Sequence, residues 1–211
     1  MYLPTQFKED RIDVVHDAIR AAGLATLVTT GEDGIIATPL PLMLDPEPAP
    51  YGTLYGHVAK ANSQWQRSDT KIEALAIFMG PDAYITPSWY ATKRATGKVV
   101  PTWNYVTVHA YGPVEFFTDG TELLDVVTRL TNRHESGRTT QWAVSDAPPD
   151  FIASQLKGIV GLRMRITRLQ GKWKMSQNRT AEDRAGVVEG LHRESTPTAG
   201  EVADIVAEKR G

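Results

Sequence analysis

The sequence contains two short clusters of aromatic side chains separated by nine residues, Tyr84-Ile85-Thr86-Pro87-Ser88-Trp89-Tyr90 and Val100-Pro101-Thr102-Trp103-Asn104-Tyr105. Lys93, Arg94 and Lys98 lie on the glycine-containing loop between them, and no acidic residue occurs in the whole stretch. Rings provide stacking area, hydroxyl and amide groups read polar edges, and cations attract negative charge. The stretch therefore suits a flat, negatively charged aromatic ligand. The alternative is a barrel core with a solvated loop, since aromatic strands often only pack.

The composition limits the class of protein. A chain of 211 residues that is 41% hydrophobic can bury one full core, so we expect one domain with appendages. The net charge of -2 gives no global basic field, and any nucleic-acid binding must use a local patch. The absence of cysteine excludes disulfides and thiolate metal sites. The first residues do not resemble a signal peptide, and no run reaches membrane-spanning length. We expect a soluble, cytoplasmic protein without membrane contact.

The hydrophobic pattern predicts a mainly β fold with peripheral helices. The predicted strands Leu24–Thr30 and Ile35–Leu44 flank Glu32-Asp33-Gly34, which predicts a tight hairpin. Further predicted strands are Thr53–Val58, Glu73–Met79 and Val99–Phe117, and Leu162–Leu169 is expected to form a hairpin with Trp173–Gln177 turned at Gln170-Gly171. The predicted helices are Lys8–Gly23, Ser63–Arg67 capped by Asn62, a helix from Asp119 to Glu135, Pro148–Lys157, and two tail pieces separated by Ser195-Thr196-Pro197. Short, closely spaced strands indicate a small barrel. We expect a barrel domain over residues 1–179 and a helical extension over 180–211.

A second candidate site lies in Gly56-His57-Val58-Ala59-Lys60-Ala61-Asn62-Ser63-Gln64-Trp65, where a strand ends and a helix begins. Such a junction presents unpaired backbone N–H groups, and His57, Lys60 and Asn62 add donors beside them. The segment is therefore a candidate phosphate cradle. The alternative is a capped surface turn with an exposed lysine.

A third candidate is the segment Lys157–Arg179, which contains no acid. Arg163 and Arg165 share a face if the segment is a strand, and they could bind phosphates of a cofactor or of nucleic acid. The alternative is a solvated face balanced by acids elsewhere. The polar run Ser176-Gln177-Asn178-Arg179 either lines a pocket edge or forms a turn. The five histidines have no ligand-like spacing, so we predict no metal site, and no catalytic residue can be assigned.

Taken together, these motifs resemble the PaiB-type FMN-binding negative transcriptional regulators, a family of the flavin-binding split-barrel group. The matching pieces are Met1-Tyr2-Leu3-Pro4 with Phe7, the Gly56–Trp65 segment, Gly80-Pro81-Asp82-Ala83 continuing into the first aromatic cluster with Lys93, the second aromatic cluster, and Lys174-Met175-Ser176-Gln177-Asn178-Arg179. They span nearly the entire chain in the family's order. Met175 stands where the family more often has leucine, and Ser63 where proline is common.

The resemblance implies a six-stranded antiparallel split β-barrel that forms a homodimer and holds FMN between its subunits. It implies that the His57–Asn62 segment meets the FMN phosphate, with Lys60 as charged partner, and that the aromatic clusters approach the ribityl chain or the isoalloxazine. The segment Lys174–Arg179 would close the site, in one arrangement from the opposite subunit. The residues expected to bind the cofactor are His57, Lys60, Asn62, Ser88, Trp89, Lys93, Thr102, Trp103, Asn104, Lys174, Gln177 and Arg179.

Three functions are compatible with FMN binding. The resemblance implies a transcriptional repressor, although the tail pieces Ala181–His192 and Thr198–Arg210 carry acids that would repel DNA, so that Lys157–Arg179 is the better DNA candidate. An FMN-dependent oxidoreductase using NAD(P)H on a small molecule is the second, with Tyr90, Tyr105 and His109 as candidate proton donors. A flavin or haem carrier, with His57 or His109 as a haem ligand, is the third.

Overall fold

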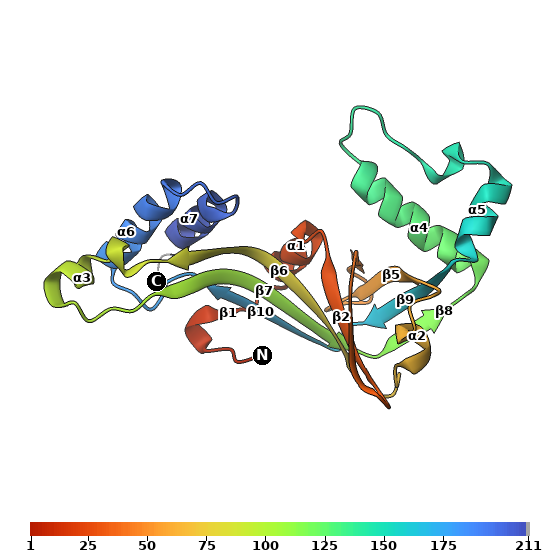
Figure 1. The fold of residues 1–211 in the computed structure, drawn as a ribbon, viewed down its shortest axis with the longest axis horizontal. Coiled ribbons are helices and arrows are strands. Elements are labelled where there is room, and N and C mark those ends of the chain that lie inside the picture. Colours follow the sequence, from red (N-terminus) through yellow and green to blue (C-terminus); the bar gives the residue numbers. More distant parts are fainter. Residues whose placement is uncertain (210–211) are drawn as a thin grey trace. The chain divides into compact units, whose positions relative to one another are not determined.

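A computed structural model describes residues 1–209 of the chain as two compact units (Figure 1). Unit 1 comprises Met1–Ala18, Met79–Val108 and the described part of Gln170–Gly211, and unit 2 comprises Ile19–Phe78 and His109–Leu169. Each unit is described by itself below. None of the helices within the described residues is both long and apolar enough to cross a membrane.

The strands and helices follow in an order that mixes short β-hairpins with isolated helices. The strands are β1 Lys8–Glu9, β2 Ala25–Gly31, β3 Gly34–Leu40, β4 Met43–Asp45, β5 Thr53–Ala59, β6 Ala74–Ile85, β7 Thr102–Gly112, β8 Val114–Phe117, β9 Ile159–Arg165 and β10 Arg168–Lys174. The helices are α1 Ile12–Ala21, α2 Gln64–Arg67, α3 Ala91–Thr96, α4 Gly120–Glu135, α5 Pro149–Leu156, α6 Ala181–His192 and α7 Ala199–Glu208. Three short 3₁₀ turns are η1 Thr5–Phe7, η2 Pro87–Trp89 and η3 Val144–Asp146.

Two sheets carry the fold, which confirms the predicted mainly β class. A six-stranded sheet has the order β1-β10-β7-β6-β2-β3, and a four-stranded sheet has the order β4-β5-β9-β8. The pairs β1–β10, β2–β3, β2–β6, β4–β5, β5–β9 and β8–β9 are antiparallel. Strands β6, β7 and β10 each have residues in both units.

The predicted hairpin of the first two long strands is confirmed. Strands β2 and β3 pair from Ala25↔Leu40 to Gly31↔Gly34, and Gly34 has a φ of 104°, a conformation that glycine adopts without a steric penalty. Behind the hairpin, the fully buried Gln64 of α2 donates its amide hydrogens to Leu27 O at 3.2 Å and Thr29 Oγ1 at 3.0 Å. These bonds fix α2 against the sheet of unit 2 because a buried amide needs partners.

The predicted hairpin turned at Gln170-Gly171 is wrong. Both residues lie inside β10, and β9 and β10 belong to different sheets. Gly171 pairs with Glu9, and a Cβ at this position would meet the Trp173 ring and the Val15 side chain at 2.8 Å. The glycine therefore permits close packing inside unit 1 rather than a turn.

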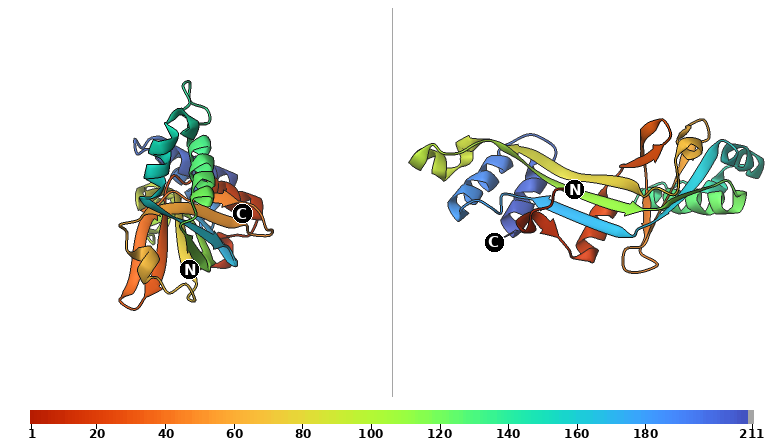
Figure 2. Two further views of the ribbon diagram at one scale, coloured as in Figure 1. Left: turned by 90° about the vertical axis from the view of Figure 1, so that its right-hand side faces the viewer. Right: turned by 90° about the horizontal axis from the view of Figure 1, so that it is seen from below.

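Six of the helices agree with the predicted ones to within a few residues, whereas α3 lies in the segment that the sequence analysis expects to be a loop. Helix α1 begins four residues later than expected because Lys8 and Glu9 pair with β10. Helix α7 ends at Glu208, and Arg210 of the predicted second tail piece lies outside the described residues. In unit 1, α6 and α7 lie side by side, and α3 contacts α6 (Figure 2).

A buried carboxylate ties two segments of unit 1 together. Glu9 is 6% exposed and accepts hydrogen bonds from Arg11 Nε and Nη2, both at 2.8 Å, and from Lys209 Nζ at 2.5 Å. The hydrogen bond from Arg11 contributes most to lowering the pKa of Glu9 from an ordinary 4.5 to about 2. Strand β1 and the segment after α7 are thereby linked by charge.

The linkage of Glu9 predicts acid sensitivity. Because the folded pKa lies below the unfolded one, its stabilisation is complete above pH 4.5 and is lost as the pH falls toward about 2. Glu9→Gln should lower the free energy of unfolding at pH 7 by about 2–3 kcal/mol and remove that part of the acid dependence. Urea unfolding between pH 7 and pH 2.5 measures both effects. Asp10→Asn, which alters an exposed ion pair with Lys8, is the control, and equal behaviour of the two variants would refute the assignment.

Candidate flavin site

One face of the unit 1 sheet combines exposed rings with lysines. Trp103 of β7 is 53% exposed, and the Tyr84 ring of β6 meets it edge-on with centroids 6.0 Å apart. Lys174 of β10 donates to Thr102 Oγ1 at 2.5 Å and to Trp103 O. Lys172, on the same face of β10, places its Nζ 5.2 Å from the centroid of the Tyr105 ring. The structure thus brings the predicted residues Thr102, Trp103 and Lys174 together.

The hydrogen-bond acceptors of the Lys174 ammonium are neutral groups, a hydroxyl and a carbonyl oxygen. Burial is the largest cause of a lowered pKa for Lys174, and repulsion from Lys172 and Arg179 acts in the same direction. Within residues 1–209 no acidic group pairs with Lys174. This cation is fixed by the Thr102 hydroxyl and the Trp103 carbonyl oxygen and has no carboxylate partner among the described residues, so it is available to an anionic group of a ligand.

The loop before β7 presents some predicted residues and uses others for packing. Ser88 and Lys93 are exposed, and the Lys93 Nζ donates to Ser88 Oγ at 3.1 Å. Trp89 is half-buried against α6, where Gly190 lies beneath its ring. Arg179 stacks over the buried Tyr90 with its Cζ 4.5 Å from the ring centroid. Burial raises the pKa of Tyr90, while the charge of Arg179 opposes that rise.

Two predicted contacts, Asn104 and Gln177, have internal hydrogen-bond partners. Asn104 is fully buried and donates to Ser176 Oγ at 3.0 Å. Gln177 donates to Trp173 O at 2.6 Å and accepts from Met175 N at 2.7 Å. The polar run after β10 therefore forms a turn, the alternative considered from the sequence. Ser176, inside this turn, has a φ of 61°, which is uncommon for a residue with a side chain.

The remaining predicted residues lie at the junction of β5 and α2 in unit 2. The His57 Nδ1 is buried and has no hydrogen-bond partner in the described structure, and burial lowers the pKa of His57. Lys60 is exposed, and no acidic partner for its ammonium is present in residues 1–209. Asn62 donates to Thr38 Oγ1 at 3.0 Å and accepts from Gln64 N at 2.9 Å, so it caps α2 as predicted.

The junction has fewer free N–H groups than the sequence predicts. Lys60 N donates to Gly158 O at 2.8 Å, Asn62 N donates to Ala59 O at 2.9 Å, and Gln64 N is occupied by the Asn62 cap. An anion at this junction would therefore depend on the Lys60 ammonium and on His57 more than on backbone donors. Of the twelve predicted residues, His57, Lys60 and Asn62 belong to unit 2 and the other nine to unit 1.

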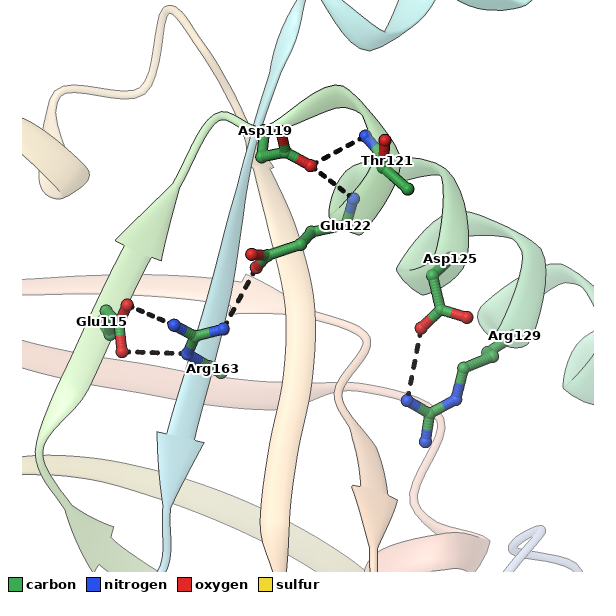
Figure 3. Close-up of polar contacts among 7 residues, drawn as sticks. All are labelled: Glu115, Asp119, Thr121, Glu122, Asp125, Arg129 and Arg163. Atoms are coloured by element: carbon green, nitrogen blue, oxygen red, sulfur yellow. Dashed lines mark hydrogen bonds and ion pairs between the residues drawn. The ribbon is translucent and has the colours of Figure 1, made fainter.

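Two arginines of the basic segment Lys157–Arg179 form ion pairs with glutamates. This agrees with the alternative considered from the sequence, a face whose charge is balanced by acids elsewhere in the chain. Arg163 donates to Glu115 from Nε at 2.9 Å and to Glu122 from Nη1 at 3.1 Å (Figure 3). Arg168 Nη2 donates to Glu73 Oε2 at 2.8 Å. The partner acids lie 41 to 95 positions away in sequence, so a reading of the segment alone could not find them.

Figure 3 also shows how the start of α4 brings Glu122 close to Arg163. Asp119 accepts from the N–H groups of Thr121 and Glu122, both at 2.9 Å, and so caps α4 as the sequence predicts. The cap orients the first turn of α4 so that Glu122 reaches Arg163 on β9. The pairing leaves Arg163 engaged with carboxylates rather than open to phosphate.

Sequence reasoning missed Lys172 and Asp183. Lys172 is buried and donates to Tyr2 O at 3.1 Å, so it supports the aromatic face from β10. Asp183 is 2% exposed and contacts the loop that carries Trp89. The pair Gly186 and Gly190, four residues apart in a predicted helix, was the available signal that something approaches α6 closely.

Comparison with known proteins shows the family to which the chain belongs. Residues 1–168 match the family described as "Putative FMN-binding domain". The chain belongs to this family. Its relatives include "Protease synthase and sporulation protein PAI 2" of Bacillus subtilis (strain 168), 34% identical over 99% of this chain and 98% of that protein, and "Uncharacterized protein AN0679" of Emericella nidulans, 34% identical over 99% and 97%. The resemblance to the PaiB-type proteins is confirmed, and FMN is the cofactor.

Solved structures show the fold. The flavocytochrome Anf3 of Azotobacter vinelandii superposes with a TM-score of 0.58 at 13% identity, covering 83% of this chain and 73% of that one. The FAD and heme binding protein of Mycobacterium smegmatis gives 0.58 at 14% identity, with coverage of 84% and 78%. The predicted split-barrel class is confirmed.

Proposed function

We propose that this protein is an FMN-binding homodimer. One face of the unit 1 sheet, the lysine–aromatic face formed by Trp103, Tyr105, Lys172 and Lys174, receives the ring system. The observation that supports this most directly is the Lys174 ammonium, held by the Thr102 hydroxyl and by the carbonyl oxygen of Trp103, whose indole is exposed. Bound FMN supplies reversible hydride or electron transfer. The indole of Trp103 offers stacking area, and Ser88 and Lys93 offer polar contacts at the edge of the loop. The cytoplasmic location is also our proposal, supported by the absence of cysteine.

We assign the phosphate of FMN to the junction of β5 and α2. The residues there fit an anion, because Lys60 carries an uncompensated positive charge and the His57 Nδ1 is buried without a partner in the described structure. A neutral imidazole can donate one hydrogen bond, and its lowered pKa is consistent with the neutral form. Asn62 contributes by holding the start of α2 in place.

Lys60→Ala tests the phosphate assignment. A charge-assisted hydrogen bond contributes about 1.5–3 kcal/mol, so the variant should bind FMN roughly tenfold to a hundredfold more weakly. Quenching of flavin fluorescence on titration measures the affinity. Lys71→Ala removes the charge of another exposed lysine of unit 2 and should leave the affinity unchanged. An unaltered affinity in Lys60→Ala would exclude this role.

The homodimer is proposed from the family and from the exposed side chains of unit 1. Met79 and Tyr84 of β6 and Val100 and Trp103 near or on β7 are each about half exposed or more. Large apolar side chains gathered on neighbouring strands are typical of interaction surfaces.

Sedimentation tests the subunit number. The FMN-loaded protein should sediment with about twice the chain mass of 23.3 kDa and bind one FMN per chain. Trp103→Arg should shift the protein toward single chains, whereas Trp142→Arg, an equally exposed tryptophan of unit 2, should not. A single-chain mass for the unaltered protein at micromolar concentration would contradict the proposal.

For the biological role we propose regulation without direct DNA contact, exercised through flavin chemistry on a small molecule. The arginines Arg163 and Arg168 are held by glutamates, which disfavours phosphate binding on these strands. The helices α6 and α7 carry exposed acids, including Glu182, Glu201 and Asp204. The fixed Lys174 cation favours electron acceptance by a bound ring, because it offsets the negative charge gained.

Anaerobic mixing with NADH or NADPH distinguishes these roles. The FMN-loaded protein should lose its visible flavin absorbance, and Lys174→Met should slow that loss by about tenfold or more if the cation assists reduction. The same preparation should not shift promoter DNA at low salt. A salt-dependent shift together with unchanged flavin absorbance would favour a direct repressor instead.

A further inference from the structure

Helix α6 makes unusually close contact with the loop that carries Ser88 and Trp89. A Cβ added at Gly190 would lie 2.3 Å from the Cδ2 and Cε2 atoms of the Trp89 indole, and one added at Gly186 would lie 2.0 Å from the Trp89 carbonyl oxygen. Residues four apart in a helix share a face, so the two glycines form one flat surface against Trp89. Any side chain at either position would displace the loop or the helix.

A buried carboxylate on the same helix binds the same loop. Asp183 is 2% exposed, its Oδ1 accepts from Thr92 N at 2.8 Å, and its Oδ2 accepts from Thr92 Oγ1 at 2.8 Å. Thr92 N lies in the first turn of α3, where the amide groups have no acceptor within the helix. Asp183 therefore supplies from 91 positions away the cap that α3 does not make for itself.

Apart from the fully buried Tyr90 side chain, the other contacts of this loop among the described residues are local hydrogen bonds. Helix α3 has six residues, too few to be stable in isolation, and Lys93, Arg94 and Lys98 are exposed. The Thr86 side chain accepts from Ser88 N at 3.2 Å, which fixes only the turn itself. Arg179, which lies just before α6 in the chain, stacks over the Tyr90 ring of this loop. The contacts with the C-terminal segment thus determine where Ser88, Trp89 and Lys93 stand.

We propose that α6 positions the loop that carries Ser88, Trp89 and Lys93. In this proposal Asp183, Gly186 and Gly190 of α6 hold the loop in the conformation that binds FMN. These three act through the loop and do not themselves touch the ligand. The inference rests on the proposed binding of FMN by this loop. It extends the binding machinery to a helix beyond residues 1–168, which are the residues matched by the family model.

The test compares Gly190→Ala and Asp183→Ala with Gly200→Ala in the full-length chain. Gly200 lies in α7, and a Cβ there meets nothing within 4 Å, so it is a matched glycine substitution in a helix. We expect the FMN dissociation constant to rise by about tenfold or more in the first two variants and to stay unchanged in the third. Asp183→Asn keeps one acceptor and should recover part of the affinity.

A second readout reports loop position without FMN. Trypsin cuts after Lys93, Arg94 and Lys98, and mass spectrometry of the peptides gives the rate of cleavage at these three bonds. Cleavage of the apo protein should be faster in Gly190→Ala and Asp183→Ala than in Gly200→Ala, with unchanged far-ultraviolet circular dichroism. Should Gly190→Ala fail to fold, Asp183→Asn and Thr92→Val decide by the same two readouts.

The outcomes separate this inference from the proposed function. If the unaltered protein binds FMN and the variants match it in both affinity and cleavage rate, the positioning role is wrong. Faster cleavage with unchanged affinity overturns it too, because the loop would then be dispensable for binding. If the unaltered protein does not bind FMN at all, the proposed function fails, and the inference fails with it even where cleavage shows that α6 holds the loop.

Discussion

The lysine–aromatic face of unit 1 depends on a half-buried positive charge, Lys174, that has no negative partner among the described residues. The Lys174 ammonium donates to a hydroxyl and to a backbone carbonyl oxygen, and burial, followed by repulsion from Lys172 and Arg179, lowers its pKa. Neutral acceptors stabilise an ammonium less than a carboxylate does, so the arrangement keeps the charge open to an incoming anion. A carboxylate in this place would stabilise the fold more but would neutralise the face. The two aromatic clusters contain no acidic residue either, which likewise leaves the face without a carboxylate that would neutralise it.

Local signals in the sequence predicted much of the fold. The Glu32-Asp33-Gly34 turn, the Asp119 cap and the Asn62 cap depend on residues within a few positions, and the structure confirms each of them. Gly171 misled because a glycine that permits close packing and a glycine that permits a turn look the same in one sequence. Only the pairing of β10 with β1, formed by residues more than 160 positions apart, distinguishes them.

The candidate site was predictable in its residue types but not in their partners. The aromatic clusters and Lys174 do assemble, because strand alternation places Lys172 and Lys174 on one face. By contrast, the amide of Asn104 is bonded to Ser176, and that of Gln177 to Trp173 and Met175. A sequence cannot show which amides are used by such internal partners. The same holds for Arg163, whose acids come from β8 and α4.

Ser176 illustrates how two demands can meet at one position. Its backbone adopts a left-handed conformation, which favours glycine or a short polar residue, while its hydroxyl is a partner of the buried Asn104 amide. Glycine would adopt this backbone conformation easily but would leave the Asn104 amide without its hydroxyl partner. Valine or leucine would neither favour the conformation nor supply the hydroxyl. Residue 176 is therefore constrained from two sides, by the conformation of its own backbone and by the buried amide of residue 104.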